Sequence, residues 1–332
     1  MIWYMRFGDE KLKNRVCLII PYFGELPQYS KLFFKSVSAN LNLDILLITD
    51  SDIKIPLKNV KVIRYTFEQL TKKIQEKFSF QIALTKPYKL CDFKPAYGYI
   101  FHEFLNDYEF WGYCDLDIIF GDFNQFVTDD ILDNYDKVYQ HGHLSLYRNC
   151  KRVNFEFMSD YGMSYREVFS THVNCVFDEL EGIQKKFDHD GFKTYKGWDF
   201  FDANPWKYHL TRVTSYVPKG ILDKDFDFIH EAFAWDQGHL FRLAVRSEKI
   251  VKNEYLYIHF QKRNYQIFEN IDKYNDVLYL TNSKCIKGIE SINKNNIDKF
   301  NAFSNIKQFE LIIKKINFVW KRRFKKYILR KG

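Results

Sequence analysis

The chain has 332 residues, of which 46% are hydrophobic and 19% aromatic, so it can bury the core of one large domain or of two smaller ones. Its net charge of +8 comes from one end: residues 311–332 carry nine Lys or Arg and no acid, while the rest carries 41 basic and 42 acidic side chains. This composition excludes a largely disordered chain and a nucleic-acid-binding surface spread over the whole protein.

Apolar runs in the first 65 residues predict the strands of a buried sheet. Val16–Pro21 and Asp44–Asp50 are nearly continuous apolar segments, as in strands covered on both faces, and Val60–Arg64 is a third strand. Helices are expected at Ser30–Asn40, Phe67–Phe78 and Asp92–Leu105. This alternation predicts an α/β fold with a doubly wound mixed sheet, in which ligands bind outside the carboxyl ends of the strands.

The sequence lacks the common glycine-rich phosphate loops. No G-x-G-x-x-G follows the first strand, and no G-x-x-x-x-G-K-[ST] occurs. The hydrolase patterns H-E-x-x-H and G-x-S-x-G are missing too. A dinucleotide-dependent oxidoreductase and a P-loop NTPase are therefore disfavoured.

An aromatic, apolar strand that begins near Tyr108 runs into three acids, Asp115, Asp117 and Asp122. Side chains two residues apart on a pleated strand point the same way, so the first two carboxylates are expected to converge. Hard oxygen ligands of this kind suit Mg²⁺ or Mn²⁺, which also bind diphosphates. The alternative is that the acids only cap the turn after a strand.

Shorter elements are expected after residue 122. The expected strands are His143–Tyr147, Phe226–Trp235, His239–Val245 and Glu254–His259, with a hairpin turn at Asp236–Gly238. The expected helices are Ser164–Phe169 and Asp178–Phe187. Residues 262–300 are expected to form peripheral helices and loops.

The end of the last of these strands carries a second group of chemically useful side chains. His259 is followed within four residues by Lys262 and Arg263. The imidazole can supply a nitrogen ligand to a metal, and the two cations can neutralise a diphosphate. A hydrogen-bonded structural histidine is the alternative.

Five segments together resemble a bacterial family found in capsule and exopolysaccharide clusters, which is itself similar to GT-A nucleotide-sugar glycosyltransferases. The segments are Pro21–Gly24, Lys89–Gly98, Phe110–Asp122, Gly142–Asn149 and Tyr257–Arg263, and the similarity covers about residues 15–265. The resemblance implies a GT-A-like, Rossmann-related fold with Asp115 and Asp117 as the D-x-D metal site. It also implies that His259 matches the downstream metal-ligand histidine of lipopolysaccharide galactosyltransferases. That group often continues with Lys-Pro-Trp, where this chain has Gln261-Lys262-Arg263.

A GT-A fold would seat the nucleotide base in the loop Pro21–Gln28. On that basis Tyr22 is expected to stack on the base and Asp50 to accept a hydrogen bond from the base or the ribose. Lys94 is expected to reach a phosphate or the donor sugar. The alternative for this last segment is a solvated helix start with Asp92 as its N-cap.

The acceptor side is less constrained. His143 is expected near the donor sugar, and Trp198 is a candidate sugar-binding residue because it offers an aromatic ring beside a carboxylate. An inverting transferase needs a carboxylate base, for which Asp199 and Asp202 are candidates, whereas a retaining transferase needs none. The sequence leaves both outcomes open.

The basic C-terminal end predicts an amphipathic helix. Residues 308–330 place apolar side chains near helical spacing, followed by a cluster of cations; the apolar side chains are Phe309, Ile312, Ile313, Ile316, Val319 and Trp320. Such a helix is typical of an anchor on an anionic membrane surface, with a nucleic-acid arm or a packed helix as alternatives. The six cysteines are scattered, as in a protein with reduced thiols, and residues 1–15 contain no apolar leader. The sequence also contains no apolar run long enough to span a membrane. These features favour a cytoplasmic protein that associates with the inner face of the membrane.

These observations predict residues 1–265 as a catalytic domain, with a nucleotide-binding half at 15–122 and an acceptor half at 123–265. Peripheral elements are expected at 266–305 and the membrane-associating tail at 306–332. The expected activity is transfer of a hexose, galactose by the resemblance, from a UDP-linked donor to a lipid-linked polysaccharide acceptor, with Mn²⁺ or Mg²⁺ as cofactor and no nucleic-acid partner. A non-catalytic nucleotide-sugar or glycan-binding scaffold at the membrane is the alternative.

Overall fold

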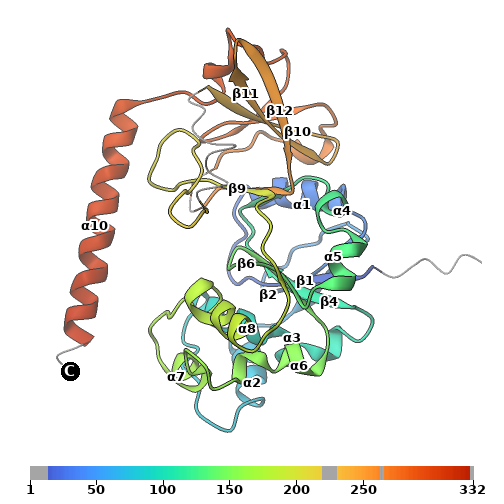
Figure 1. The fold of residues 1–332 in the computed structure, drawn as a ribbon, viewed down its shortest axis with the longest axis vertical. Coiled ribbons are helices and arrows are strands. Elements are labelled where there is room, and N and C mark those ends of the chain that lie inside the picture. Colours follow the sequence, from blue (N-terminus) through green and yellow to red (C-terminus); the bar gives the residue numbers. More distant parts are fainter. Residues whose placement is uncertain (1–13, 219–229, 262, 264, 330–332) are drawn as a thin grey trace, which may run out of the picture. The chain divides into compact units, whose positions relative to one another are not determined.

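The computed structural model describes residues 14–218, 230–261, 263 and 265–329, with only the backbone for 321–329 (Figure 1). The chain forms two compact units. Unit 1 comprises Met1–Leu26, Leu41–Asp115 and Val127–Gly197, and unit 2 comprises Pro27–Asn40, Leu116–Phe126 and Trp198–Gly332. The expected mixed α/β fold with a C-terminal helix is confirmed.

Unit 1 is built on a seven-stranded mixed sheet. In spatial order its strands are β3 (Val60–Arg64), β2 (Leu43–Thr49), β1 (Val16–Pro21), β4 (Phe110–Cys114), β7 (Leu144–Arg148), β6 (Lys137–His141) and β8 (Thr194–Tyr195). The first four run parallel, because β1 pairs in parallel with both β2 and β4 and β2 pairs in parallel with β3. β7 is antiparallel to β4 and to β6.

Unit 1 also contains short helical elements, of which α2 contributes apolar side chains to the core. The helix α2 (Phe67–Gln75) begins at Thr66, which forms a capping box with Gln69, and buries Leu70 and Ile74. The other helical elements are η1 (Pro87–Ala96), α3 (Tyr97–Ile100), η2 (His102–Phe104), α5 (Asp129–Asn134), α6 (Lys151–Asn154), η3 (Glu156–Met158), α7 (Tyr165–Ser170), η4 (Leu180–Gln184) and α8 (Lys185–His189).

The expected single helix Asp92–Leu105 is wrong. The segment instead starts at Pro87 as the 3₁₀ helix η1, which contains Pro95, and continues as the short elements α3 and η2. Proline has no N–H to donate and its ring disfavours a helical residue before it, so a regular α-helix cannot run through Pro95 without a break.

Unit 2 contains two smaller sheets. One has the order β5 (Ile118–Phe120), β13 (Tyr257–His259) and β9 (Phe200–Asp202), and the other has the order β12 (Lys249–Tyr255), β11 (His239–Arg246), β10 (Glu231–Asp236), β14 (Leu278–Leu280) and β15 (Cys285–Lys287). The helical elements are α1 (Ser30–Ser38), α4 (Phe123–Phe126), η5 (Ile271–Lys273), η6 (Ile297–Lys299) and α10 (Asn305–Leu329), the long red helix in Figure 1.

Two expectations about unit 2 can be compared directly with its strands. The predicted hairpin is confirmed: β10 and β11 pair antiparallel, and Gln237 and Gly238 at the turn have φ of 47° and 96°. The predicted strand Glu254–His259 is instead divided at Leu256 between β12 and β13, which belong to different sheets. Residues 266–305, expected only as peripheral helices and loops, contribute β14 and β15.

None of the helices in the described part of the chain combines the length and the apolar character needed to cross a membrane.

Candidate active site

The D-x-D segment lies in a turn and not within a strand. β4 ends at Cys114, Asp115 is the last residue of its segment in unit 1, and Leu116 and Asp117 lead into β5 of unit 2. The two acids are therefore joined through one residue but belong to different units.

In unit 1, Asp115 forms an ion pair with a buried lysine. The Nζ atom of Lys94 lies 2.7 Å from Asp115 Oδ1 and 3.3 Å from Asp178 Oδ2, and it donates to the carbonyl oxygen of Gly142 at 2.7 Å. Burial lowers the pKa of Lys94, but the Asp115 carboxylate and other nearby groups outweigh this effect, so the pKa is well above its ordinary value. Lys94 is thus a fixed cation, and the alternative of a solvated helix start is wrong.

Asp178, which is buried, and Glu179, which is partly exposed, form an acidic pair that the sequence did not single out. Burial raises the pKa of Asp178 to about 6, although Lys94 partly offsets this shift. Burial and then the charge of Asp178 raise the pKa of Glu179 to about 8. At neutral pH Glu179 can therefore donate a hydrogen bond as a protonated carboxyl, while Asp178 accepts one.

Gly142 connects β6 with β7 and leaves room for these acids. A Cβ atom there would lie 2.6 Å from Asp178 Oδ2 and 2.7 Å from Glu179 Oε1. The flanking rings of His141 and His143 stack with centroids 5.2 Å apart, and both rings are buried. The predicted sugar-binding residue His143 thus lies next to the glycine that packs on the acidic pair.

The predicted nucleotide-binding residues Tyr22 and Asp50 lie at the ends of neighbouring parallel strands. Tyr22 follows β1 and donates its backbone N–H to Ile48 of β2, and Asp50 follows β2 directly. The Asp50 carboxylate accepts the backbone N–H of Gly24 at 2.8 Å, where Gly24 has a φ of 91°. Asp50 therefore stabilises the loop after β1, the loop in which the nucleotide base was expected.

In unit 2, Asp117 and Asp202 flank the imidazole of His259. Strand pairing explains the arrangement, because His259 is in register with Ile118 of β5 on one side and with Asp202 of β9 on the other. The Nε2 atom of His259 lies 3.2 Å from Asp117 Oδ1, and Nδ1 lies 2.8 Å from Asp202 Oδ1. The backbone N–H of Phe260 donates to the carbonyl of Asp117 at 3.0 Å, which fixes the turn against β13.

The Asp202 carboxylate is buried and has several hydrogen-bond donors. Its Oδ1 accepts from His259 and from Gln261 Nε2, the latter at 2.7 Å, and its Oδ2 accepts from the hydroxyl of Tyr216. Gln261 has a φ of 42°, in the left-handed region that glutamine seldom adopts. These contacts make Asp202 a residue that orients His259, whereas a general base would need access to a substrate hydroxyl.

Burial alone would lower the pKa of His259. The carboxylates of Asp117 and then Asp202 act in the opposite direction and raise this pKa well above its ordinary value. The imidazole pairs electrostatically with two acids, and a divalent cation between Nε2 and Asp117 would replace the Nε2 proton.

The donor atoms in unit 2 fit a divalent metal. Metal-binding histidines commonly donate one ring N–H to a carboxylate and present the other nitrogen to the metal, as the contacts of His259 with Asp202 and Asp117 allow. A carboxylate oxygen and an imidazole nitrogen together suit Mn²⁺, and Mg²⁺ to a lesser degree, because Mg²⁺ favours all-oxygen sites.

A group of stacked aromatic rings lies on the segments next to Asp202. Trp198 stacks on Phe200 at 5.8 Å and on Tyr216 at 5.9 Å, and Phe200 stacks on Tyr257 at 5.1 Å. The Arg212 guanidinium lies over the rings of Trp198 and Phe200. The predicted base candidate Asp199 follows Trp198 and is half-buried, and its backbone carbonyl accepts the N–H of Leu256 at 2.6 Å.

Arg263, predicted to bind diphosphate, connects several loops of unit 2. Its two terminal nitrogens donate to four backbone carbonyls at 2.7–3.3 Å, those of Asn204, Lys207, Tyr208 and Asn282. Arg263 and Asp117 also line a cavity of about 10 Å³, the size of one water molecule. The other predicted cation, Lys262, lies outside the described residues.

The site residues that the sequence analysis missed are Asp178, Glu179, Tyr216 and Gln261. Asp178, Glu179 and Tyr216 stand in no motif with recognisable spacing, and Asp178 is 63 positions after Asp115. Gln261 lies in the Tyr257–Arg263 segment, two residues after His259, and this position was the one signal that could have pointed to it.

Comparisons with known proteins place the chain in a family. The model of a family of unknown function, DUF6625, matches residues 18–288. No curated protein matches the sequence.

Three solved structures show a distant likeness. The galactosyltransferase LgtC, solved with donor and acceptor sugar analogs, has 10% identity and a TM-score of 0.36 over 64% of this chain and 84% of LgtC. The glycosyltransferase GlyE of Streptococcus pneumoniae TIGR4 has 13% identity and a TM-score of 0.32 over 56% of this chain and 46% of GlyE. Mouse xyloside xylosyltransferase 1 in its apo form has 10% identity and a TM-score of 0.31 over 55% of this chain and 77% of that enzyme. Since the family model spans most of its length, the chain belongs to the family of unknown function DUF6625.

Proposed function

We propose that the protein is a metal-dependent hexosyltransferase that uses a nucleotide diphosphate sugar. The observation that carries this proposal is the pair of contacts of His259, with Nδ1 on Asp202 and Nε2 facing Asp117 at the end of the D-x-D segment. A divalent cation would bind between His259 Nε2 and the Asp117 carboxylate, which lie 3.2 Å apart, in place of the proton that they share, and diphosphates bind to such cations.

Asp117 and His259 would hold Mn²⁺ or Mg²⁺, and Asp115 is included because only Leu116 separates it from Asp117 in the chain. When bound, the metal supplies Lewis-acid stabilisation of the negative charge on the departing diphosphate. Asp202 fixes the imidazole so that Nε2 is the ligand nitrogen. Lys94 holds the Asp115 carboxylate in place through its 2.7 Å ion pair.

The donor is proposed to be UDP-linked, with galactose as the first sugar to test. The loop after β1 would receive the base on Tyr22, and Asp50 keeps that loop in position through Gly24. The acidic pair of unit 1 supplies the polar contacts that a sugar needs, since Glu179 can donate to a hydroxyl and Asp178 can accept from one.

The acceptor is proposed to be a lipid-linked glycan of capsule, exopolysaccharide or lipopolysaccharide synthesis. Trp198 is the proposed sugar contact on this side, whereas His143 is proposed to lie near the donor sugar. Asp199 is the proposed base if the reaction inverts the anomeric centre, because the contacts of Asp202 already commit its carboxylate to His259 and Tyr216.

The helix α10 is proposed to associate with an anionic membrane on the cytoplasmic side. Ile306, Phe309, Ile313, Ile316 and Trp320 follow each other at intervals of three or four residues, so they share one face of the helix, and each is 44–77% exposed.

The opposite side of α10 contacts the rest of unit 2. Gln308 bonds to Trp206 and Tyr208, and the ring of Phe318 lies 5.5 Å from that of Trp206. The apolar face is therefore directed away from these contacts. Seven of the nine C-terminal cations follow Trp320 in the sequence, as in helices that bind anionic lipids.

Mass spectrometry with UDP-hexoses, Mn²⁺ and a pooled acceptor library tests the function. The expected result is metal-dependent donor hydrolysis or transfer that is lost in Asp117→Ala and in excess chelator. Asp122→Asn is the matched control, because the carboxylate of this third acid of the segment accepts the backbone N–H of Asn124, a bond that the amide oxygen can keep. Full activity of Asp117→Ala would exclude the metal mechanism, and donor binding without turnover would indicate a scaffold.

A further inference from the structure

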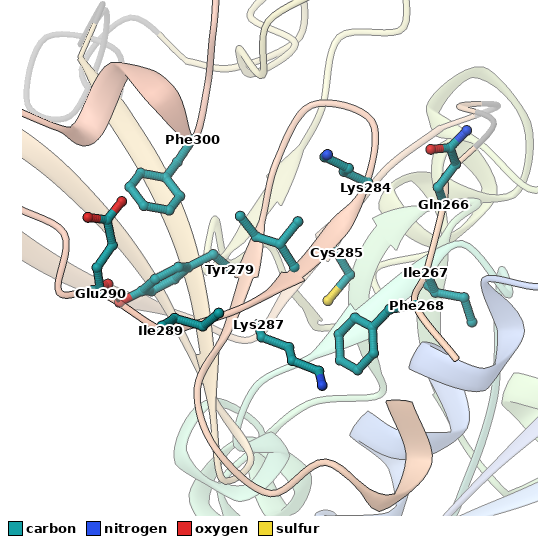
Figure 2. A pocket seen from close by; sticks show the side chains of 11 residues that line it. Gln266, Ile267, Phe268, Tyr279, Lys284, Cys285, Lys287, Ile289, Glu290 and Phe300 are labelled. Atoms are coloured by element: carbon teal, nitrogen blue, oxygen red, sulfur yellow. Dashed lines mark hydrogen bonds between the residues drawn. The ribbon is translucent and has the colours of Figure 1, made fainter. Parts of the chain in front are cut away.

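Some buried titratable side chains have no part in the proposed chemistry. Cys285 of β15 lies beside Phe268 (Figure 2), and burial raises the pKa of this thiol to about 12. A neutral buried thiol behaves as a small apolar side chain. Lys137 of β6 differs, because its side chain ends in an amine that is fully buried in unit 1.

Within the part of the chain that the structure describes, the amine of Lys137 bonds only to neutral groups. Its Nζ atom donates to the backbone carbonyl of Tyr139 and, at 3.0 Å, to Oε1 of Gln184, and it lies 3.4 Å from Oγ of Ser145. Burial lowers the pKa of Lys137 to about 7, which more distant carboxylates offset only in part. Lysine is seldom fully buried without a carboxylate partner, so its bonds to these neutral groups indicate a specific role.

Tyr139 is the strained residue of a β-bulge. Its φ is 63°, in the left-handed region that a buried tyrosine seldom adopts. Two residues of β6, Tyr139 and Gln140, lie opposite Ser145 of β7 alone. A bulge of this kind redirects the residues that follow it. The bond from Lys137 thus supports the backbone just before His141–His143, which we call the Gly142 loop.

Ser145 connects the same amine to the Gly142 loop. The Ser145 hydroxyl donates to the carbonyl of His141 at 3.0 Å. Gly142 follows, and a Cβ atom there would lie 2.6 and 2.7 Å from carboxylate oxygens of Asp178 and Glu179. Because the loop packs this closely on the acidic pair, a shift of the loop changes the position of the acids.

Lys137 also holds the segment that follows the acidic pair. Gln184 is the last residue of η4, which begins directly after Glu179. Two backbone N–H groups of η4 donate to the carbonyls of Phe177 and Glu179, on either side of Asp178, at 2.8 and 3.0 Å. The element η4 is thus bonded to both neighbours of Asp178, and its last side chain is bonded to Lys137.

We propose that Lys137 is a positioning residue that holds the Gly142 loop and η4 around Asp178 and Glu179, so that this acidic pair can bind the sugar of a nucleotide sugar. The role in sugar binding rests on the proposed function, whereas the positioning of the pair does not. Lys137 is fully buried and acts only through its neighbours. A methionine of similar length would fill the same space without the bonds of the amine.

Calorimetry with UDP and with UDP-galactose, each with Mn²⁺, tests the effect on sugar binding. Lys137→Met should weaken UDP-galactose binding about tenfold and leave UDP binding unchanged, because UDP lacks the sugar that the acidic pair would contact. Ser145→Ala, a smaller change that removes the bond to His141, should weaken UDP-galactose binding severalfold. Equal weakening of both ligands would assign Lys137 to the stability of the fold alone and overturn the proposal, as would unchanged binding of both.

Lys186→Met is the matched control. Lys186 is also fully buried, and its amine donates to the backbone carbonyls of Ser159 and Tyr161, which belong to neither segment that Lys137 joins. This variant should lower the stability of the protein and leave the ratio of the UDP and UDP-galactose affinities unchanged. A selective loss of UDP-galactose binding in Lys186→Met as well would contradict a specific role for Lys137.

Hydrogen exchange of the ligand-free protein tests the positioning without a sugar. In Lys137→Met the amides of residues 139–144 and 180–184 should exchange at least about tenfold faster, while those of β1 and β2 remain unchanged. Acceleration throughout unit 1, or none in these two segments, would overturn the positioning role. If neither UDP nor UDP-galactose binds to the unaltered protein, the proposed donor is wrong, and the exchange result alone decides whether Lys137 positions the acidic pair.

Discussion

The Nδ1 atom of His259 lies 2.8 Å from Oδ1 of Asp202, and this contact determines that Nε2 is the ring nitrogen that faces Asp117. The two residues are register partners on the parallel strands β13 and β9. Sheet pairing thus sets the orientation of the imidazole, and any metal bound by His259 depends on a residue 57 positions earlier in the chain.

Asp202→Asn is expected to weaken Mn²⁺ binding about 10- to 100-fold, because a neutral amide holds the imidazole less firmly and lowers its basicity. Titration calorimetry with Mn²⁺ measures this directly, without reference to turnover. Asp298→Asn is the control, since Asp298 makes a similar 2.7 Å contact with His230 on the surface. Unchanged Mn²⁺ affinity in Asp202→Asn would show that Asp202 only fills the core.

A buried ion pair stabilises the segment that precedes the acidic pair of unit 1. Lys89 Nζ lies 2.6 Å from Asp92 Oδ2, and both side chains are almost fully buried. Asp92 also accepts the N–H groups of Cys175 and Phe177, and Lys89 donates to the carbonyls of Val168 and Val173. The pair connects η1 to the loop that leads to Asp178.

Lys89→Met is expected to lower the free energy of unfolding by roughly 3–5 kcal/mol, because it leaves the Asp92 carboxylate buried without a counter-charge. The double variant Lys89→Met with Asp92→Asn should recover part of this loss, since no charge is then buried without a partner, although the amide oxygen can accept only one of the two N–H groups that bond to separate oxygens of Asp92. Urea unfolding measures both variants. Lys185→Met removes an exposed pair with Glu181 and should leave the urea midpoint nearly unchanged. A similar loss in both single variants would contradict a special role for burial.

The first strands could be predicted from the sequence because their signal is local. Val16–Pro21 is an apolar run of a length that only a buried strand accommodates, and β1 has the predicted bounds. The D-x-D segment was found for the same reason. The segment follows directly after β4, as predicted. The prediction that both acids continue one pleated strand is wrong, because the chain turns at Leu116.

The environment of the acids could not be predicted, because it depends on contacts between distant parts of the chain. Lys94 forms ion pairs with Asp115 and Asp178, which lie 21 and 84 positions away in the sequence, and neither contact was predicted. Asp202 was one of two candidate bases for an inverting reaction, and its contacts with His259 and Tyr216, which come from other segments, were not predicted. Tertiary contacts of this kind leave no periodic pattern in a single sequence.

Glu156 makes the stability of the protein depend on pH. Burial, followed by a hydrogen bond with Asp190, raises the pKa of Glu156 from 4.5 to about 7. Between these values the folded protein retains a proton that the unfolded chain has lost. The free energy of unfolding should therefore fall as the pH rises from about 4.5 through 7, and the contribution of Glu156 is fully present only below that window.

Glu156→Gln removes this titration. Relative to the unaltered protein it should gain about 1–2 kcal/mol between pH 5 and pH 8, less than the full pKa shift implies, because the carboxyl keeps some contact with solvent. Urea midpoints at the two pH values measure the difference. Glu181→Gln, at an exposed position, should leave the pH dependence unchanged. An identical slope in Glu156→Gln would assign the pH dependence to other groups.

The exposed apolar face of α10 predicts a specific loss of membrane binding. Ile313→Ser with Ile316→Ser removes two of its side chains without a change in net charge, so binding to phosphatidylglycerol vesicles should weaken at least about tenfold. Vesicle co-sedimentation measures this partitioning, and high salt should weaken the binding of the unaltered protein because the C-terminal cations are screened.

Leu41→Ser is the control, because Leu41 is an exposed apolar residue of unit 1 outside the helix. It should bind vesicles as the unaltered protein does. The Ile313→Ser, Ile316→Ser variant should retain donor hydrolysis, since neither residue contacts the candidate active site of unit 2. If this variant sediments with vesicles as strongly as the control, the apolar face does not insert, and any membrane binding is due to the cations alone.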